Sequence, residues 1–252
     1  MKLTVLGSGT LFLTKNRFPS SFLLEVDNKK ILLDCGFGTI ARLAEIGIDH
    51  RDIDLIFISH FHTDHFGDAF NLIHSRWVGD VYDKLENKKL IYIGPKTIEE
   101  RFRKWREIFW SEPKESYPVE FHEGEISYKI DGIELKIFPV VHVPWFDSVG
   151  VQLFAENKKI VYPGDIGSSH NFNDLIEKSQ NADLLIIESG YPHQTPNHFS
   201  CDQIKELTEK ARIKQVLVVH NQHIESEEKR IKEFISKNLK FKLGEDKMVL
   251  NL

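Results

Sequence analysis

Short apolar runs separated by turn residues dominate the first half of the chain, and their length is typical of buried strands. These predicted strands cover residues 3–6, 22–26, 31–33, 55–59 and 90–93. A turn at Asp27 and Asn28 separates the second strand from the third. Because residues 55–59 are almost uninterruptedly apolar, they indicate a strand that is buried on both faces.

Three segments of the first half have helical spacing instead, and they cover residues 39–46, 66–77 and 97–110. Gly47 is expected to close the first of them, because glycine readily adopts the left-handed conformation that ends a helix. In the third segment the residues at helical spacing are Ile98, Phe102, Trp105 and Phe109. This spacing predicts an amphipathic helix with its apolar side on the protein and its charged side in water.

The second half alternates between strand and helix patterns. Hairpin turns are expected at Asp131-Gly132 and near Glu156-Asn157, and buried strands at residues 160–162, 184–187 and 216–219. A helix is expected at 201–211, where Ser200 and Gln203 fit a capping box, and another near 226–236. Short strands near Phe241 and at 248–250 end the chain. No linker divides this pattern, which predicts one α/β domain over residues 1–252 with its helices outside.

Composition and charge narrow the class of protein. Of the 252 residues 41% are hydrophobic, enough for a sizeable core, and the net charge of −5 excludes a basic coat for non-specific nucleic-acid binding. The apolar start of the chain is interrupted at Gly7 and Gly9, which predicts a strand rather than a signal peptide, and no run is long enough to span a membrane. Cys35 and Cys201 form no metal-binding or disulfide pattern. A cytoplasmic, reducing compartment is therefore expected.

A dense group of metal-ligand residues follows the predicted strand 55–59. Residues 60–65 read His-Phe-His-Thr-Asp-His, so that His60, His62, Asp64 and His65 fall within six positions. Burying so many polar groups without partners would cost several kcal/mol. Imidazole nitrogens and carboxylate oxygens are ordinary ligands of zinc and similar metals. The run therefore predicts a metal site.

Three further candidates stand at or just beyond the ends of predicted strands. They are His142, Asp165 and His220. In α/β sheets, ligand sites form at the edge where the strands end. We therefore expect these three side chains to join the cluster at residues 60–65.

This pattern resembles the metallo-β-lactamase superfamily. The run at 60–65, His142, Asp165 within Pro-Gly-Asp, and His220 follow the superfamily signature in order, and Leu33-Asp34-Cys35-Gly36 extends the resemblance over almost the entire chain. The resemblance implies an α/β fold, a four-layer αββα sandwich, with two divalent metal ions between its sheets. It also implies two ligand sets bridged by Asp165, namely His60, His62 and His142 for one metal, and Asp64, His65 and His220 for the other. Zinc is the expected metal, with manganese and iron as alternatives.

The expected chemistry of such a site is hydrolysis. Coordination to a metal lowers the pKa of water to about 7, so a metal-bound hydroxide is available as nucleophile near neutral pH. Two divalent ions outweigh the two aspartates and one hydroxide, which favours an anionic substrate. Asp34 and Asp68 are candidates for orienting ligand histidines, with capping or solvated carboxylates as the alternative.

Two residues are similar to a pair found in the ribonuclease Z branch and in related cyclic phosphodiesterases. Glu188 ends the predicted strand 184–187, and His198 precedes the helix that leads to His220. The similarity implies catalytic roles for Glu188 and His198 beside Asp64, with His198 assisting at the scissile phosphate. The short stretch between His142 and Asp165 leaves no room for the RNA-gripping arm of many ribonuclease Z proteins. The expected substrate is therefore a smaller anionic phosphodiester or an oligonucleotide.

Other hypotheses stay open at this point. Within the same fold, a lactonase or thioester hydrolase is the main alternative, and a metal-loaded scaffold without turnover is the non-catalytic one. Trp145 and Phe146 lie close to His142 in the chain and are candidates for lining a substrate pocket. Basic and aromatic residues interleave at 101–106, but their helical spacing favours a solvated charged face over a nucleic-acid site. A homodimer is compatible with the sequence.

Overall fold

The computed structural model describes residues 1–109, 117–189, 191, 195–221 and 224–252. Its strands form two seven-stranded sheets. From edge to edge, the first sheet contains β14 (Val249–Asn251), β1 (Lys2–Gly7), β2 (Ser21–Val26), β3 (Lys29–Leu33), β4 (Leu55–Phe57), β5 (Leu90–Gly94) and β6 (Val119–Glu123). The second contains β13 (Phe241–Leu243), β12 (Gln215–Val219), β11 (Leu184–Glu188), β10 (Lys158–Tyr162), β9 (Ser148–Ala155), β8 (Ile133–Val140) and β7 (Ser127–Ile130).

Each sheet is antiparallel in one part and parallel in the other. In the first sheet β14, β1, β2 and β3 pair antiparallel, whereas β3, β4, β5 and β6 pair parallel. In the second, β7, β8, β9 and β10 pair antiparallel and β10, β11, β12 and β13 pair parallel. The parallel strands of one sheet therefore end at a common edge, where ligand sites form in α/β proteins.

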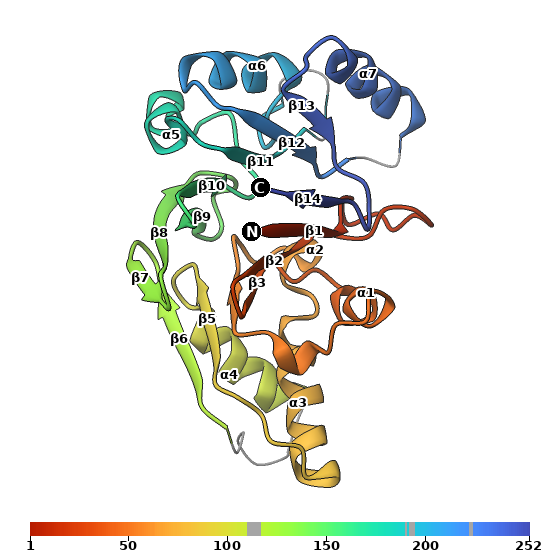
Figure 1. Ribbon diagram of the computed structural model, residues 1–252, viewed down its shortest axis with the longest axis vertical. Helices are drawn as coiled ribbons and strands as arrows, with labels where there is room; N and C mark the ends of the chain where they lie inside the picture. The colour runs from red at the N-terminus through yellow and green to blue at the C-terminus, as the bar shows by residue number, and fades with distance from the viewer. Residues whose placement is uncertain (110–116, 190, 192–194, 222–223) are drawn as a thin grey trace.

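Helices cover the outer face of each sheet (Figure 1). The first sheet is covered by α1 (Thr39–Glu45), α3 (Ala69–Asp83) and α4 (Ile98–Phe109), together with the short α2 (Thr63–Phe66) and η1 (His50–Asp52). The second is covered by α5 (Phe172–Ser179), α6 (Cys201–Lys210) and α7 (Glu225–Ser236). The result is the αββα sandwich that the sequence resemblance implies.

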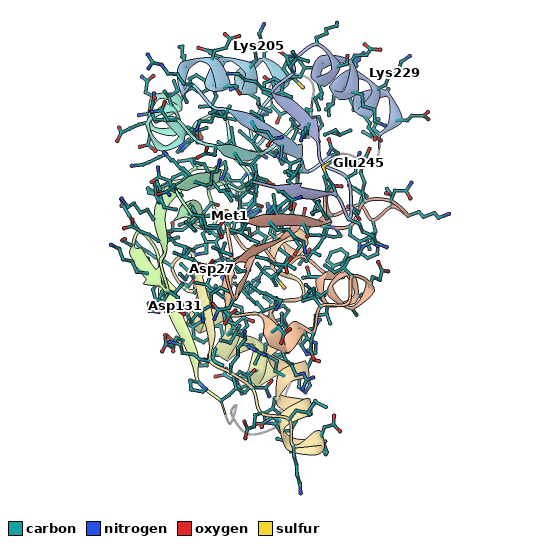
Figure 2. All side chains as sticks on the ribbon, viewed as in Figure 1. Met1, Asp27, Asp131, Lys205, Lys229 and Glu245 are labelled. Carbon is teal, nitrogen blue, oxygen red and sulfur yellow. The ribbon has the colours of Figure 1, made fainter. Side chains whose placement is uncertain are left out.

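Three apolar clusters hold the four layers together. The central cluster lies between the sheets and includes Phe22, Leu33, Leu153 and Leu217. The two outer clusters join each sheet to its own helices, and side chains fill the spaces between the ribbons of Figure 1 (Figure 2). Full burial of one such side chain contributes roughly 1.5–3 kcal/mol, so the sheets hold the loops at their ends in place. Among the described residues, no helix combines the length and apolarity needed to cross a bilayer.

Most of the expected elements are present, and the differences have local causes. The predicted helix 66–77 is two helices, because the chain turns at Gly67 and Asp68, and Asp68 accepts hydrogen bonds from the backbone of the α1 start. The predicted strand 55–59 ends at Phe57. The half-buried edge strand β6 and the short helix α5 were not predicted. Trp110, the expected end of α4, lies outside the described residues.

The predicted caps are present. Ser200 and Gln203 form the expected capping box at the start of α6. Gly47 has a φ of 74°, and its N–H donates to the carbonyl of Ala44, as expected of a residue that closes α1. Cys35 and Cys201 are both buried free thiols.

Candidate metal centre and active site

The candidate residues stand where strands of both sheets end. Asp34 follows β3 and His60 lies just beyond β4, while His142, Asp165 and His220 lie just beyond β8, β10 and β12. His62 is the N-cap of α2, whose single turn carries Asp64 and His65. The packing of the two sheets brings these loops together, so side chains that are up to 160 positions apart in the chain become neighbours.

The first group of side chains contains three imidazoles. His60 Nε2 and His62 Nδ1 lie 3.0 Å apart, and His142 Nε2 lies 3.4 Å from the same His62 atom. Asp165 Oδ2 is 3.9 Å from both His60 Nε2 and His142 Nε2. Three ring nitrogens and a carboxylate oxygen thus converge on one point, which is the arrangement that a bound cation requires.

The second group lies on the other side of Asp165. His220 Nε2 is 3.3 Å from Asp64 Oδ2, and His65 Nε2 is 3.9 Å from that oxygen. Asp165 Oδ1 lies 3.5 Å from His65 Nε2, whereas Oδ2 lies 3.4 Å from His220 Nε2. The Asp165 carboxylate therefore borders both groups, which is the placement of a bridging ligand.

The chemistry of this cluster fits two divalent metal ions. Its donor atoms are five imidazoles and two carboxylates, and His65 Nε2 is buried with no hydrogen-bond partner although it points at two carboxylates. A cation between these groups would satisfy that nitrogen. The assignment of each residue to one metal, and the identity of the metal, stay predictions.

The electrostatics of the two groups differ. Burial lowers the pKa values of His60, His62 and His142, so these rings are neutral and their nitrogens can bind a metal. Burial also opposes protonation of His65, but the charges of Asp165, Asp34 and Asp64 raise its pKa to about 10. The negative charges of these carboxylates hold a proton on His65, and the same charges attract a metal ion. Proton and metal therefore compete for this group.

Asp34 supports His65 from outside the cluster. Its fully buried carboxylate accepts hydrogen bonds from Ser59 N at 2.6 Å, Ser59 Oγ at 2.8 Å and Tyr162 Oη at 2.5 Å. His65 Nδ1 donates to the same carboxylate at 2.6 Å. Because Asp34 holds the proton on Nδ1, Nε2 is the ring nitrogen that faces the cluster, and its lone pair would become available to a metal ion that displaces the second proton. Asp34 has a φ of 59°, which places its side chain there at the cost of backbone strain.

Asp68, the other sequence candidate for orienting a ligand, has a different role. Its Oδ2 accepts hydrogen bonds from Gly38 N at 2.9 Å and Ile40 N at 3.1 Å. These N–H groups belong to the start of α1, so Asp68 caps that helix. The ring of His142 is instead oriented by the carbonyl of Asn197, which lies 3.0 Å from its Nδ1.

Glu188 and His198 form a pair beside the cluster. Glu188 Oε2 lies 2.5 Å from His198 Nδ1, while Oε1 accepts a hydrogen bond from Ile166 N at 2.8 Å. The ring of His198 lies 5.5 Å from those of both His142 and His220. Burial lowers the pKa of His198, but the Glu188 carboxylate outweighs it and raises the pKa to about 9. The glutamate side chain is 1% exposed and that of the histidine 21%, so the imidazole is the accessible member of the pair.

Aromatic side chains border the same site. The ring of Phe146 lies 5.0 Å from that of His62 and 6.1 Å from that of Phe61, whereas Trp145 is 68% exposed. On α4, Arg103 and Lys104 pair with Glu107 and Glu100 on the solvent side, as the spacing predicts. The guanidinium of Arg101 instead lies 4.0 Å above the Phe61 ring.

Two residues at the site were missed by sequence reasoning. Tyr162 ends β10, three positions before Asp165, and its hydroxyl reaches Asp34 in the other sheet. Lys96 follows the end of β5, at the same edge as the residue 60–65 loop. The rule that functional residues follow strand ends could have found both.

Comparisons of sequence connect this geometry to known proteins. The family model described as "Anti-Pycsar protein Apyc1" matches residues 1–240, which include every residue of the cluster. Ribonuclease Z of Ignicoccus hospitalis (strain KIN4/I) is 25% identical over 274 residues, covering 87% of each chain. A ribonuclease Z of Mycobacterium sp. (strain KMS) is 27% identical over 177 residues, which cover 66% of this chain and 61% of that protein.

Solved structures with the same fold cover nearly the whole chain. The metallo-β-lactamase fold protein YhfI from Bacillus subtilis has a TM-score of 0.81 at 21% identity, over 99% of this chain and 98% of that one. The short form of human tRNase Z has a TM-score of 0.79 at 21% identity, over 100% and 99% of the two chains. A diphosphatase of the PhnP family has a TM-score of 0.77 at 19% identity, over 100% and 97%. These likenesses establish the metallo-β-lactamase fold.

Proposed function

This chain belongs to the Anti-Pycsar Apyc1 family of metallo-β-lactamase-fold hydrolases, and we propose that it is a binuclear metal-dependent phosphodiesterase that hydrolyses small nucleotide substrates, cyclic nucleotides first among them. His60, His62 and His142 would hold one metal ion, Asp64, His65 and His220 would hold the other, and Asp165 would be a ligand of both. Two divalent cations, zinc in the first instance, supply positive charge and an activated water molecule when bound.

The observation that carries this proposal is the Glu188–His198 pair. An alkoxide is a poor leaving group, so cleavage of a phosphodiester requires a proton donor at the leaving oxygen. Glu188 accepts the Nδ1 proton of His198 at 2.5 Å, which leaves Nε2 of the protonated ring as the donor toward substrate. In the metal-free protein the Glu188 carboxylate raises the pKa of that ring to about 9, which favours its protonated form. As the bond from phosphorus to the leaving oxygen breaks, the Nε2 proton passes to that oxygen.

The loops around the site favour a small substrate. Only β9, β10 and short connections lie between His142 and Asp165, so no long arm extends from this part of the chain. Phe146, beside the His62 ring, and the exposed Trp145 are placed to contact the organic part of the substrate. Aromatic rings stack well on nucleobases, which accords with a nucleotide substrate.

A panel of substrates tests the proposal. Metal-loaded protein is assayed with bis-p-nitrophenyl phosphate, nucleoside 3′,5′-cyclic phosphates, lactones and glutathione thioesters. General acid catalysis contributes about 10²–10⁴-fold, so His198→Ala is expected to lower kcat for phosphodiesters with alkoxide leaving groups by at least about 100-fold. The matched control is His122→Ala, on the edge strand β6, where the imidazole faces Glu120 at 3.8 Å. Metal content, measured on each variant, is expected to stay at two ions.

The rival functions give different results in the same panel. A lactonase or thioester hydrolase would turn over those substrates faster than any phosphodiester. A scaffold would bind two metal ions and hydrolyse nothing. A His198→Ala variant that retains full activity on cyclic nucleotides would refute the role of the pair even if the enzyme proves to be a phosphodiesterase.

A further inference from the structure

A cavity opens beside the metal centre, on the far side of Phe146. Its volume is about 580 Å³, within the range of roughly 300–1,000 Å³ that is usual for small-molecule sites. The walls come from the end of β8, the start of β9 and the loop between them, from Lys96 after β5, and from Gly124 and Glu125 after β6. Phe146 lines this cavity and also lies 5.0 Å from the ring of His62. The cavity and the metal centre therefore share a wall.

The apolar part of the lining is exposed without an evident structural reason. Trp145 is 68% exposed and Val141 is 47% exposed, and both line the cavity. Large apolar side chains at the mouth of a cavity next to a reaction centre are typical of ligand contacts. An indole ring so placed offers a stacking surface for a flat aromatic ligand.

The charged part of the lining contains a single cation. Among the described residues that line the cavity, Lys96 is the basic one, and Glu125 and Asp147 are the acidic ones. A Cβ atom added at Gly124 would lie 3.6 Å from Lys96 Cγ and 3.8 Å from Cε, so the lysine stem runs along this turn. The Lys96 ammonium has three donors and no acceptor, so it binds oxygen or nitrogen acceptors of a ligand.

We propose that this cavity binds the nucleobase of the substrate, with Trp145 stacking on the base and Lys96 selecting bases that carry a carbonyl oxygen. The inference rests on the proposed phosphodiesterase function and adds the specificity of that same site. With the phosphate at the metal centre, the cavity that shares Phe146 receives the rest of the nucleotide. Glu125 or Asp147 accepts the ring N–H next to the carbonyl.

Lysine discriminates between the two purines. Guanine presents O6 and N7 as adjacent acceptors, which lysine and arginine bind, whereas adenine presents an amino group at the equivalent position. The Lys96 ammonium and the adenine amino group are both hydrogen-bond donors, so no hydrogen bond can form between them. Guanine nucleotides are therefore the preferred purine substrates.

The kinetic test compares bases within one set of variants. The kcat/KM values for 3′,5′-cyclic GMP, 3′,5′-cyclic AMP and the base-free bis-p-nitrophenyl phosphate are measured for the wild type, Lys96→Met, Trp145→Ala and Lys205→Met. Lys205 lies on the outer surface of α6 and serves as the matched control (Figure 2). Lys96→Met is expected to lower kcat/KM for cyclic GMP about tenfold and to leave cyclic AMP within twofold. Trp145→Ala is expected to raise KM for both nucleotides about tenfold, whereas Lys205→Met is expected to leave all three substrates unchanged.

A binding measurement separates this inference from the proposed function. Saturation-transfer NMR with guanosine and adenosine, which carry no phosphate, reports on the cavity in chelator-treated protein without turnover. Guanosine contact that is lost in Lys96→Met and Trp145→Ala supports the base pocket even if no phosphodiester is hydrolysed. The base pocket would be overturned if Lys96→Met weakened binding of guanosine and adenosine equally, or if the variants changed neither the nucleoside binding nor the nucleotide kinetics. Hydrolysis of bis-p-nitrophenyl phosphate would still leave the phosphodiesterase proposal standing.

Discussion

Replacing Asp34 by asparagine tests how the buried network supports the metal centre. Asp34 Oδ2 accepts hydrogen bonds from Ser59 Oγ, His65 Nδ1 and Tyr162 Oη, and Oδ1 accepts one from Ser59 N. Asparagine keeps one acceptor oxygen and turns the other into an NH₂ donor. Whichever way the amide points, at least one of these donors then faces another donor.

The magnitude follows from the number of donors that lose their acceptor. A buried donor without a partner costs about 1–3 kcal/mol, so one or two of them lower the free energy of unfolding by roughly 1–6 kcal/mol. That is a large share of a total stability of about 5–15 kcal/mol. Loss of a hydrogen bond that orients a metal ligand commonly lowers metal affinity about 10–100-fold. Asp34→Asn is therefore expected to weaken the proposed metal site of Asp64, His65 and His220 more than the proposed site of His60, His62 and His142.

Two assays and two matched variants check this expectation. Urea unfolding of the metal-free protein gives the stability, and competition with a chromophoric chelator gives the affinity for each ion. Tyr162→Phe removes one of the four hydrogen bonds and is expected to have a smaller effect on both. Asp68→Asn disturbs the cap of α1 and is expected to lower stability without changing metal affinity. If Asp34→Asn binds two ions as tightly as the wild type, the reasoning that Asp34 orients His65 is wrong.

Three further outcomes are expected. Gly164→Ala places a Cβ atom 2.5 Å from Ser59 Cβ at a φ of 68°, so it should lower both stability and metal content. The control Gly132→Ala, at a φ of 81° with open space around it, should cost only the backbone strain of about 1–2 kcal/mol. Thermal unfolding and metal analysis distinguish the two variants. Zinc added to chelator-treated protein at 100 times its Kd should raise the Tm by about 10–20 °C when both ions bind and should saturate at two ions per chain, whereas saturation at one ion would contradict the binuclear site. In metal-free protein the imidazole of His198 should titrate near pH 9, and Glu188→Gln should return its pKa toward 6.5, as followed by NMR. Because the folded-state pKa of His198 is raised, its contribution to stability is complete below about pH 6.5 and is lost as the pH rises through about 9.

The sequence alone determined most of the elements and most of the cluster. Strand and helix periodicities are local properties, so they located the strands before His142, Asp165 and His220 without any knowledge of the fold. The density of ligand residues at 60–65 is also local, because one turn of chain carries it. Glu188 and His198 were found through their similarity to a pair in the ribonuclease Z branch, one at a strand end and the other before a helix, and the structure places them 2.5 Å apart.

Only the tertiary structure decided which side chains support and surround that cluster. Asp34 and Asp68 were equal candidates by sequence, yet one contacts His65 and the other caps α1. Tyr162 reaches Asp34 across the interface between the sheets, and Lys96 meets Trp145 around one cavity. These pairs come from different sheets or from loops far apart in the chain. Their proximity depends on how the two sheets pack through the central apolar cluster, and no local pattern of residues encodes that packing.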